Sequence, residues 1–395
     1  MKVNFKALIS FIFMIAISVL FMLFLDGPGG SYLLISILSA LIISFLVFLW
    51  SKKTISANVE LSEDILNKGD ILKITVQLRK KGFLPTSFIR FSFSSSVHFN
   101  SEGRKIYSTI IFAQDSYFVE ESITAAFFGN GNAGVTDMVI SDYLGIFSYS
   151  LNDPSLYKTI KIYPDIPEVS GRDNFARSLT DAVSFDDSEE TSQSVSSING
   201  VPGYDHRKYV PGDNIKLINW KVSAKRGELL VRQLEGTGGA EQIFVLIRDD
   251  LYFEESQFAA EAMLGIMKIF ARAELPVKVV LFINDSWEVI PVLNTSDLAQ
   301  LRYRMTDYYI FPLKKYCEQN NCKIAPELRK IAIPDSVEGD RVVVFAPVCD
   351  ENLAGFLDSL SVQGKEYEAA VCSGAITSKH IRKIERDNLS VRFSD

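Results

Sequence analysis

Side chains that could act as nucleophiles, bases or zinc ligands are few and scattered in this chain. The three histidines, His98, His206 and His380, lie far apart in the sequence, and the four cysteines fall within residues 317–372. Two of these cysteines form a C-x4-C pair, which matches no common zinc-binding spacing. A Ser-His-Asp or Cys-His site would need distant residues to meet in the fold, with His206 or His380 as the base. We expect the cysteines to be structural thiols in a reducing compartment.

A basic segment, residues 207–232, is the second candidate for a functional site. It holds seven Lys or Arg and two acidic residues, although the whole chain has a formal net charge of −7. Pro211, Gly212 and Asp213 predict a tight turn, and "INWK" predicts a strand or the start of one. We expect Trp220 to be buried and to fix a β-hairpin or an extended arm. The basic side chains are then either solvated or a docking patch for an acidic partner or for anionic lipid headgroups.

The same segment carries an ordered series of short motifs. A Tyr-x-Pro-Gly-Asp turn is followed by Ile-x-Trp-Lys, by Ser-Ala-Lys and by a Val-Arg-x-x-Glu strand. This series closely resembles the hallmark of the domain of unknown function 58 family. The stretches "SDYLGIFSYS" and "IKIYPDIPEV" are similar to other segments usual in that family. The resemblance assigns to the family motif and to a candidate partner surface Tyr209, Pro211, Gly212, Asp213, Trp220, Lys221, Ser223, Lys225, Arg226 and Arg232.

What this resemblance implies is an architecture and a kind of partner. Members of the family look like membrane-anchored proteins whose C-terminal part is similar to a von Willebrand factor A domain. They often accompany MoxR-type AAA+ ATPases and transglutaminase-like membrane proteins, so one of these is the expected protein partner. We expect no cofactor and no catalytic residue.

A von Willebrand A domain that binds metal has Asp-x-Ser-x-Ser after its first strand, because hard oxygen ligands suit Mg²⁺. Here the apolar run "QIFVLIR" leads into Asp249 and Asp250, and "LYF" follows where the hydroxyls should stand. We therefore predict a degenerate motif and no metal site. Asp250 and Glu254 are the remaining oxygen ligands for a residual site.

These features favour a membrane-anchored, non-enzymatic scaffold or protein-interaction module that works with a MoxR-type AAA+ ATPase. The first alternative is a metal-dependent adhesion-type binding module that uses Asp249 and Asp250. The second is a hydrolase or transferase. The negative net charge gives no support for nucleic-acid binding, and the chain has neither a G-x-G-x-x-G sequence after its first α/β strand nor a Walker A sequence.

Two uncharged apolar segments, residues 7–25 and 31–50, open the chain. Each would form a helix of about 30 Å, the thickness of the hydrocarbon core of a bilayer. The intervening "DGPGG" permits a reversal, so a transmembrane hairpin in contact with the lipid bilayer is expected. Lys6 and Lys52 flank its outer ends, and the loop has no Lys or Arg. The positive-inside rule then predicts a two-pass cell-membrane protein with a cytoplasmic N-terminus and cytoplasmic C-terminal domains. A cleaved signal peptide is the weaker alternative.

Three regions follow the hairpin of residues 1–50. Residues 51–165 alternate apolar and polar side chains, which predicts an antiparallel, all-β sandwich-like domain. Residues 166–202 are rich in Ser and acidic side chains, which predicts an exposed linker, with phosphorylation left open. Residues 203–395 combine the motif arm with alternating strands and helices, including a helix over residues 378–387. This alternation is typical of a doubly wound, mostly parallel sheet, here a von Willebrand A-like, Rossmann-like α/β domain.

Overall fold

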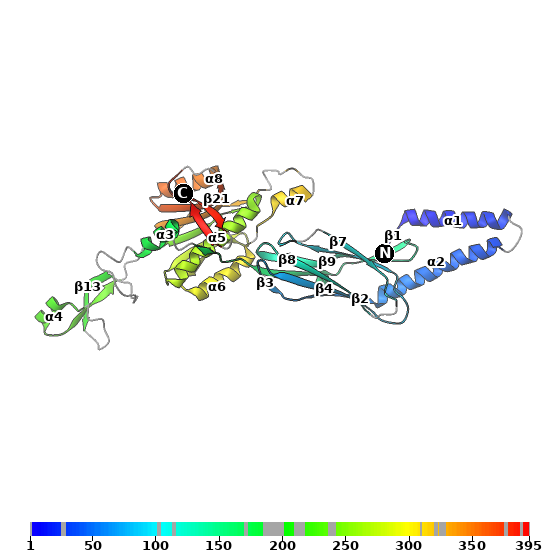
Figure 1. Cartoon of the computed structure of the whole chain (residues 1–395), viewed down its shortest axis with the longest axis horizontal. Coiled ribbons are helices and arrows are strands. Elements are labelled where there is room, and N and C mark those ends of the chain that lie inside the picture. Colours follow the sequence, from blue (N-terminus) through cyan, green and yellow to red (C-terminus); the bar gives the residue numbers. More distant parts are fainter. Residues whose placement is uncertain are drawn as a thin grey trace. The chain divides into compact units, whose positions relative to one another are not determined.

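A computed structural model describes most of the chain, in two compact units. The first comprises Met1–Asp165 with Met305–Asp307, and the second comprises Ile166–Arg304 and Tyr308–Asp395. Figure 1 shows the elements of both units. The described residues are 2–24, 29–100, 104–112, 116–169, 173–184, 201–208, 218–235, 242–308, 310–319, 323, 329–374, 378–387 and 390–394.

Two long apolar helices open the first unit, α1 (Phe5–Phe24) and α2 (Gly29–Thr54). Their mean hydropathies reach 2.8 and 2.7, so both are long and apolar enough to cross a membrane. A Cβ on Gly30 would lie 2.4 Å from the Cα of Met22, so the glycine allows the two helices to approach closely. The two apolar helices expected from the sequence are confirmed.

Both outer ends of this helical pair are attached to one strand, β10 (Phe147–Leu151). Before α1, β1 (Lys2–Val3) pairs with β10 in antiparallel register. In the second half of α2, the ring of Phe45 lies 4.9 Å from the ring of Phe147 on the same strand, and closer to the helix end Nζ of Lys52 lies 4.3 Å from the ring of Tyr149. The helical pair is therefore joined to the β-rich part of the unit without a spacer at either end.

Two sheets make up the rest of the first unit. One contains β1, β3, β5, β7, β9, β10 and β11, and the other contains β2, β4, β6 and β8. Among the described strands, β3 and β11 form a parallel pair and the other neighbours are antiparallel. The predicted strand-rich domain is confirmed, but one of its two sheets is mixed, because it contains the parallel pair β3–β11. The further bounds are β2 (Ile55–Leu61), β3 (Ile65–Asn67), β4 (Ile71–Lys80), β5 (Phe88–Ser95), β6 (Phe99–Asn100), β7 (Lys105–Thr109), β8 (Ser116–Ala125), β9 (Gly129–Ser141) and β11 (Tyr157–Tyr163).

An eight-stranded sheet forms the centre of the second unit, in the order β12-β23-β22-β21-β20-β15-β17-β18. The strands from β22 to β17 are parallel neighbours. β18 is antiparallel to β17, and β23 is antiparallel to β22 and parallel to β12. The bounds are β12 (Glu168–Val169), β15 (Gln242–Leu246), β17 (Val277–Ile283), β18 (Ser286–Val292), β20 (Arg341–Cys349), β21 (Glu366–Gly374), β22 (Ile381–Asp387) and β23 (Ser390–Ser394).

Helices cover both faces of this sheet because successive strand residues point to opposite sides. On one face, the ring of Phe270 in α5 lies 5.4 Å from that of Phe244 in β15. On the other, Leu353 and Phe356 of α8 join a buried cluster that includes Val245. The predicted alternation of strands and helices is confirmed (Figure 1). The helices are α5 (Phe253–Arg272), α6 (Thr295–Arg304), α7 (Leu313–Gln319) and α8 (Glu351–Val362).

Two predictions about secondary structure were wrong. Within the expected linker, α3 (Asn174–Ser184) forms because Phe175 and Leu179 share one face of the helix and are buried. The helix expected over residues 378–387 is strand β22. Its apolar spacing suits a helix, but pairing with β21 on one side and β23 on the other overrides that local preference.

Candidate functional site

The carboxyl end of the eight-stranded sheet has the geometry of a binding site. β15 and β20 are parallel neighbours, and the chain leaves them in opposite directions, through α5 to β17 and through α8 to β21. Open α/β sheets bind ligands at such a switch point, in the crevice outside the carboxyl ends of the strands. Asp249 follows β15, and Asp350 directly follows β20.

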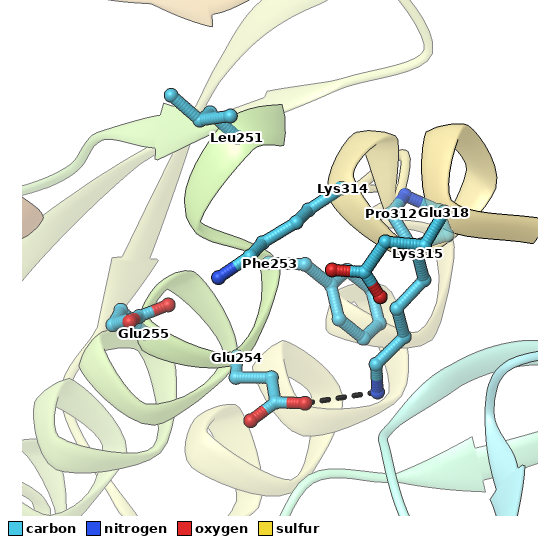
Figure 2. Close-up of a pocket in the computed structure, with 8 residues that line it drawn as sticks. All are labelled: Leu251, Phe253, Glu254, Glu255, Pro312, Lys314, Lys315 and Glu318. Carbon is cyan, nitrogen blue, oxygen red and sulfur yellow. Dashed lines mark ion pairs between the residues drawn. The ribbon is translucent and has the colours of Figure 1, made fainter. Parts of the chain in front are cut away.

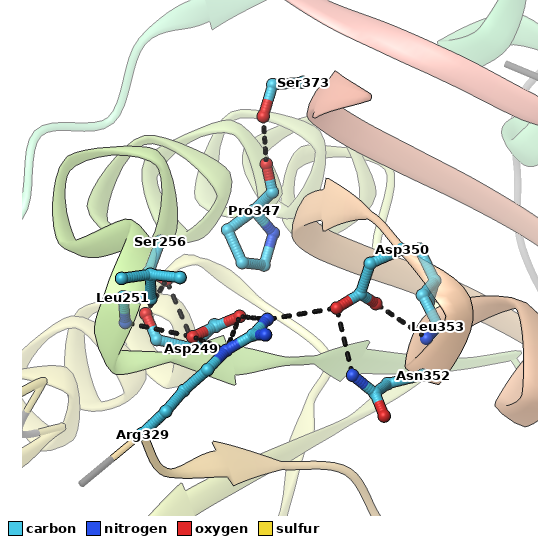
Figure 3. A network of polar contacts seen from close by, with 9 residues as sticks. All are labelled: Asp249, Leu251, Ser256, Arg329, Pro347, Asp350, Asn352, Leu353 and Ser373. Atoms are coloured by element: carbon cyan, nitrogen blue, oxygen red, sulfur yellow. Dashed lines mark hydrogen bonds and ion pairs between the residues drawn. The ribbon is translucent and has the colours of Figure 1, made fainter. Parts of the chain in front are cut away.

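Arg329 joins these two carboxylates (Figure 3). Its Nε donates to Oδ1 and Oδ2 of Asp249 at 3.1 and 3.2 Å. Its Nη2 donates to Oδ2 of Asp249 and, at 3.0 Å, to Oδ2 of Asp350. The side chain of Asp249 is 3% exposed, and those of Arg329 and Asp350 are 26% and 27% exposed. The hydrogen bonds to Asp249 raise the pKa of Arg329, so the guanidinium keeps its charge.

Backbone hydrogen bonds hold both carboxylates in place. Oδ1 of Asp249 accepts from the N–H of Leu251 at 2.9 Å. Oδ1 of Asp350 accepts from the N–H of Leu353 at 3.0 Å, which caps the first turn of α8. Burial would raise the pKa of Asp350, but the hydrogen bonds that it accepts outweigh burial, and the net pKa is lowered. Asp350 is therefore a carboxylate that both caps a helix and binds Arg329.

A magnesium ion does not fit this arrangement. The nearest serine hydroxyl in the sequence is that of Ser256, and it is already bound to the backbone of Asp249. It accepts a hydrogen bond of 3.3 Å from the N–H of Asp249 and donates one of 3.1 Å to the carbonyl of Asp249. Leu251 has no side-chain oxygen, and the guanidinium of Arg329 binds both carboxylates. Within the described ranges, no group of three or more His, Cys, Asp or Glu could hold a metal ion.

Asp250, adjacent to Asp249 in the sequence, has different partners. It accepts from the N–H of Phe311 at 3.2 Å and forms an ion pair of 3.5 Å with Nε of Arg248. It is 2% exposed, and this burial raises the pKa of its carboxyl, against the opposing effects of Arg248 and Phe311. Glu254, the other ligand considered for a residual metal site, pairs instead with Lys315.

A pocket of about 220 Å³ lies at the N-terminal end of α5 (Figure 2). Across it, Nζ of Lys315 in α7 lies 2.9 Å from Oε1 of Glu254. Side chains of both charges surround the opening, which suits a polar protein surface better than an apolar small molecule. The lining residues are Leu251, Phe253, Glu254, Glu255, Pro312, Lys314, Lys315 and Glu318.

The cysteines near the end of the sheet are poorly suited to nucleophilic chemistry. Burial raises the pKa of Cys372 to about 12 and also raises that of Cys349. The thiol of Cys372 donates to the carbonyl of Glu255 at 3.3 Å. A catalytic cysteine needs a lowered pKa, because the thiolate is the nucleophile. The ring of His380 packs 5.8 Å from that of Tyr367.

The basic motif segment contains a short helix, α4 (Trp220–Arg226), between two paired strands. β13 (Val201–Lys208) and β14 (Leu230–Glu235) are antiparallel. Asn219 begins the helix, because its side chain accepts from the N–H of Val222 at 3.3 Å. Gly227 ends it with a φ of 70°, a conformation that glycine adopts without strain.

Ser223 of the motif joins α4 to β14. Its hydroxyl accepts from the N–H of Leu230 at 2.9 Å. The N–H of Asn219 also donates to the carbonyl of Leu230, at 2.9 Å. The hydrogen bond to Leu230 gives Ser223 a structural role.

The expectation that Trp220 is buried was wrong. "INWK" is the start of a helix, and the Trp220 side chain is 60% exposed, whereas Ile218 is 7% exposed. Lys221, Lys225 and Arg226 on the same helix are also exposed. These four residues, Trp220, Lys221, Lys225 and Arg226, are called the motif patch below.

The remaining motif residues are less fully placed. Arg232 lies in β14, paired with His206 in β13. The turn residues Tyr209, Pro211, Gly212 and Asp213 lie outside the described residues.

Sequence reasoning missed Asp350 and Arg329. Asp350 had a usable signal, since it stands between an apolar strand and a helical run, where Asp is a common cap. Arg329 had none. It is 80 residues from Asp249 in the sequence, and only the fold brings the two together.

Residues 205–258 match the family model described as protein of unknown function DUF58. This range covers the motif patch, Asp249 and the start of α5. This match supports the resemblance to the DUF58 family that the motif series carries. No curated protein matches this chain.

Several solved structures resemble part of this chain. The Escherichia coli alpha-2-macroglobulin fragment from domain MG7 to the C-terminus is 13% identical with a TM-score of 0.23, and the match covers 29% of this chain and 17% of the fragment. The metal-bound CARDB domain from Pyrococcus furiosus is 12% identical with a TM-score of 0.19, and the match covers 27% of this chain and 91% of that domain. The Bacillus subtilis sporulation control protein Spo0M is 14% identical with a TM-score of 0.18, and the match covers 28% of this chain and 49% of Spo0M.

Proposed function

We propose that this DUF58 protein is a membrane-anchored, non-enzymatic scaffold that binds a protein partner through its second unit. The observation that carries the proposal is the position of Arg329 between Asp249 and Asp350. Its guanidinium fills the switch point, where a domain of this layout would hold a small ligand or a metal ion. Binding is therefore assigned to two other surfaces of the second unit, the motif patch and the pocket at the start of α5.

We assign the second unit a von Willebrand A-like fold. Support comes from its mostly parallel sheet, the antiparallel edge strand β18 and the helices on both faces. The metal-dependent adhesion alternative needs Asp249 to be free to bind an ion, whereas Asp249 already accepts hydrogen bonds from Arg329 and from the N–H of Leu251.

The helical pair is assigned as a two-pass anchor in the cell membrane. The attachment of both of its outer ends to β10 supports a hairpin whose ends share one side of the bilayer. Lys6 and Lys52 near these ends support a cytoplasmic location for that side, and hence for both units.

A MoxR-type AAA+ ATPase is the first candidate partner, and a transglutaminase-like membrane protein is the second. The motif patch combines an exposed tryptophan with three exposed cations. Tryptophan and arginine are enriched in the energetic centres of interfaces, and cations accelerate association with an acidic surface. The patch therefore suits an acidic face of the partner.

The test is copurification of the partner with the full chain from native membranes at low and high salt. The wild-type protein should retain a MoxR-type ATPase at low salt and lose part of it at high salt. The triple variant Lys221→Glu, Lys225→Glu and Arg226→Glu should retain much less.

A matched triple variant in the first unit provides the control. Lys73→Glu, Arg79→Glu and Lys81→Glu cause the same change in net charge at exposed sites outside the motif patch. This variant should copurify as the wild type does. Equal loss of the ATPase from both variants would mean that net charge, and not the motif patch, governs binding.

A further inference from the structure

We propose that Arg329 is a built-in cation that takes the place of a divalent ion at the switch point of the second unit. The sheet brings two carboxylates together there, and the chain supplies its own counter-charge from a third segment. This inference deepens the proposed function, since both rest on the position of Arg329 between the two carboxylates. Its test needs no partner, so the two can fail separately.

The position of Arg329 follows from strand pairing. β16 (Arg248–Asp249) pairs with β19 (Ile331–Ala332), with Asp249 opposite Ile331. The N–H of Asp250 also donates to the carbonyl of Lys330 at 3.1 Å. The ladder therefore fixes the backbone two residues after Arg329 and aligns its side chain with Asp249.

The need for a cation follows from burial. Asp249 is almost fully buried and Asp350 mostly so, and each accepts a backbone hydrogen bond. Two carboxylates at one partly buried site repel each other unless a positive charge binds both. Arg329 provides that charge, with two donor nitrogens toward Asp249 and one toward Asp350.

The geometry suits a guanidinium and not a magnesium ion. The planar fork of arginine matches a carboxylate with paired hydrogen bonds, as Arg329 does with Asp249. Magnesium requires near-octahedral oxygen ligands, and the hydroxyl of Ser256 is bound to the backbone of Asp249. We infer that Arg329 clamps the end of β15 to the start of α8 without any metal.

Hydrogen–deuterium exchange of the full chain in detergent, resolved by mass spectrometry, tests the clamp locally. The reporters are the amides of Leu251 and Leu353, which donate to the two carboxylates. In the wild-type protein, neither Mg²⁺ nor EDTA should change their exchange. In Arg329→Ala both should exchange about tenfold faster or more, because charged hydrogen bonds are lost around them.

Chemical rescue of Arg329→Ala distinguishes the loss of the positive charge from a general destabilisation of the fold. Methylguanidinium should slow exchange at both reporters in Arg329→Ala and leave the wild type unchanged. Arg329→Lys, which keeps the charge and loses the fork, should show an intermediate rate. The control is Arg341→Ala, which removes a partly buried ion pair between Arg341 in β20 and Glu368 in β21. It should not alter exchange at Leu251 or Leu353, with or without methylguanidinium.

Two results would overturn the proposal. One is exchange in Arg329→Ala equal to that of the wild type at both reporters. The other is slower exchange on addition of Mg²⁺ to the wild-type protein, because an ion would then bind despite the guanidinium.

Discussion

The hydroxyl of Ser44 on helix α2 donates a hydrogen bond of 3.0 Å to Oδ2 of Asp142, at the end of β9. Asp142 is 2% exposed, and its other oxygen accepts from the N–H of Phe147 at 2.8 Å. The N–H of Tyr143 donates in turn to the Ser44 hydroxyl at 3.0 Å. One buried carboxylate thus organises the loop before β10 and joins that loop to an apolar helix.

Replacing Asp142 with Ala should destabilise the first unit by about 3 kcal/mol or more, because hydrogen bonds to a charged group contribute roughly 1.5–3 kcal/mol each. The measurement is thermal unfolding of the full chain in detergent. Asp137→Ala is the control, since Asp137 pairs with Arg104 at a site where both side chains are 55% exposed. It should cost less than about 1 kcal/mol. Similar losses for the two variants would contradict the structural role of Asp142.

Trp220→Ala should change the stability of the protein little, because the side chain is 60% exposed. It should instead weaken capture of the partner, since the tryptophan is the apolar element of the motif patch. Phe270→Ala provides the comparison, because Phe270 is fully buried and its truncation should cost about 3–5 kcal/mol. Melting and copurification of both variants check this. A large drop in melting temperature for Trp220→Ala would mean that the tryptophan packs in the fold.

The proposed topology predicts opposite labelling of two introduced cysteines. In a background without native cysteines, Gly29→Cys at the start of α2 should react with a membrane-impermeant maleimide in intact cells. Val362→Cys, at an 89% exposed position in α8, should react only after the membrane is opened. The reverse pattern would place both units outside the cytoplasm.

His98 should make the first unit less stable in mild acid. Burial lowers the pKa of this histidine to about 4, below its usual 6.5. Between these values the unfolded chain binds the extra proton, so stability is lost as the pH falls from 6.5 toward 4. The expected loss is about 2 kcal/mol between about pH 7 and pH 5. Thermal unfolding over this range should show a shallower pH dependence for His98→Gln. An unchanged dependence would mean that other groups cause it.

The sequence predicted the elements that depend on long local patterns. The uncharged apolar segments became α1 and α2, and the apolar run before Asp249 became the buried strand β15. Prediction from the sequence failed where contacts with other elements of the fold determine the conformation of a segment. Residues 381–387 have helical spacing and form a strand because β21 and β23 lie on either side.

The candidate site was predictable only in part for the same reason. Asp249 could be found because it follows a strand, and the apolar residues after it led to the expectation of a degenerate metal motif. Trp220 was misjudged because a large aromatic residue usually favours burial, whereas the cap at Asn219 starts a helix that leaves it exposed. Arg329 could not be found, since its role depends on the pairing of β16 with β19.

The pairing of β1 with β10 has a consequence for how the protein is made. Lys2 and Val3 reach the ribosome exit long before Ser148 and Phe147, their partners, have been synthesised. In the proposed two-pass topology, the strand pair can form only if the N-terminus lies on the side of the membrane where β10 is delivered. A chain inserted in the opposite orientation would leave the edge of β10 unpaired. In that topology, completion of the sheet distinguishes correctly inserted chains from those that retain an open strand edge.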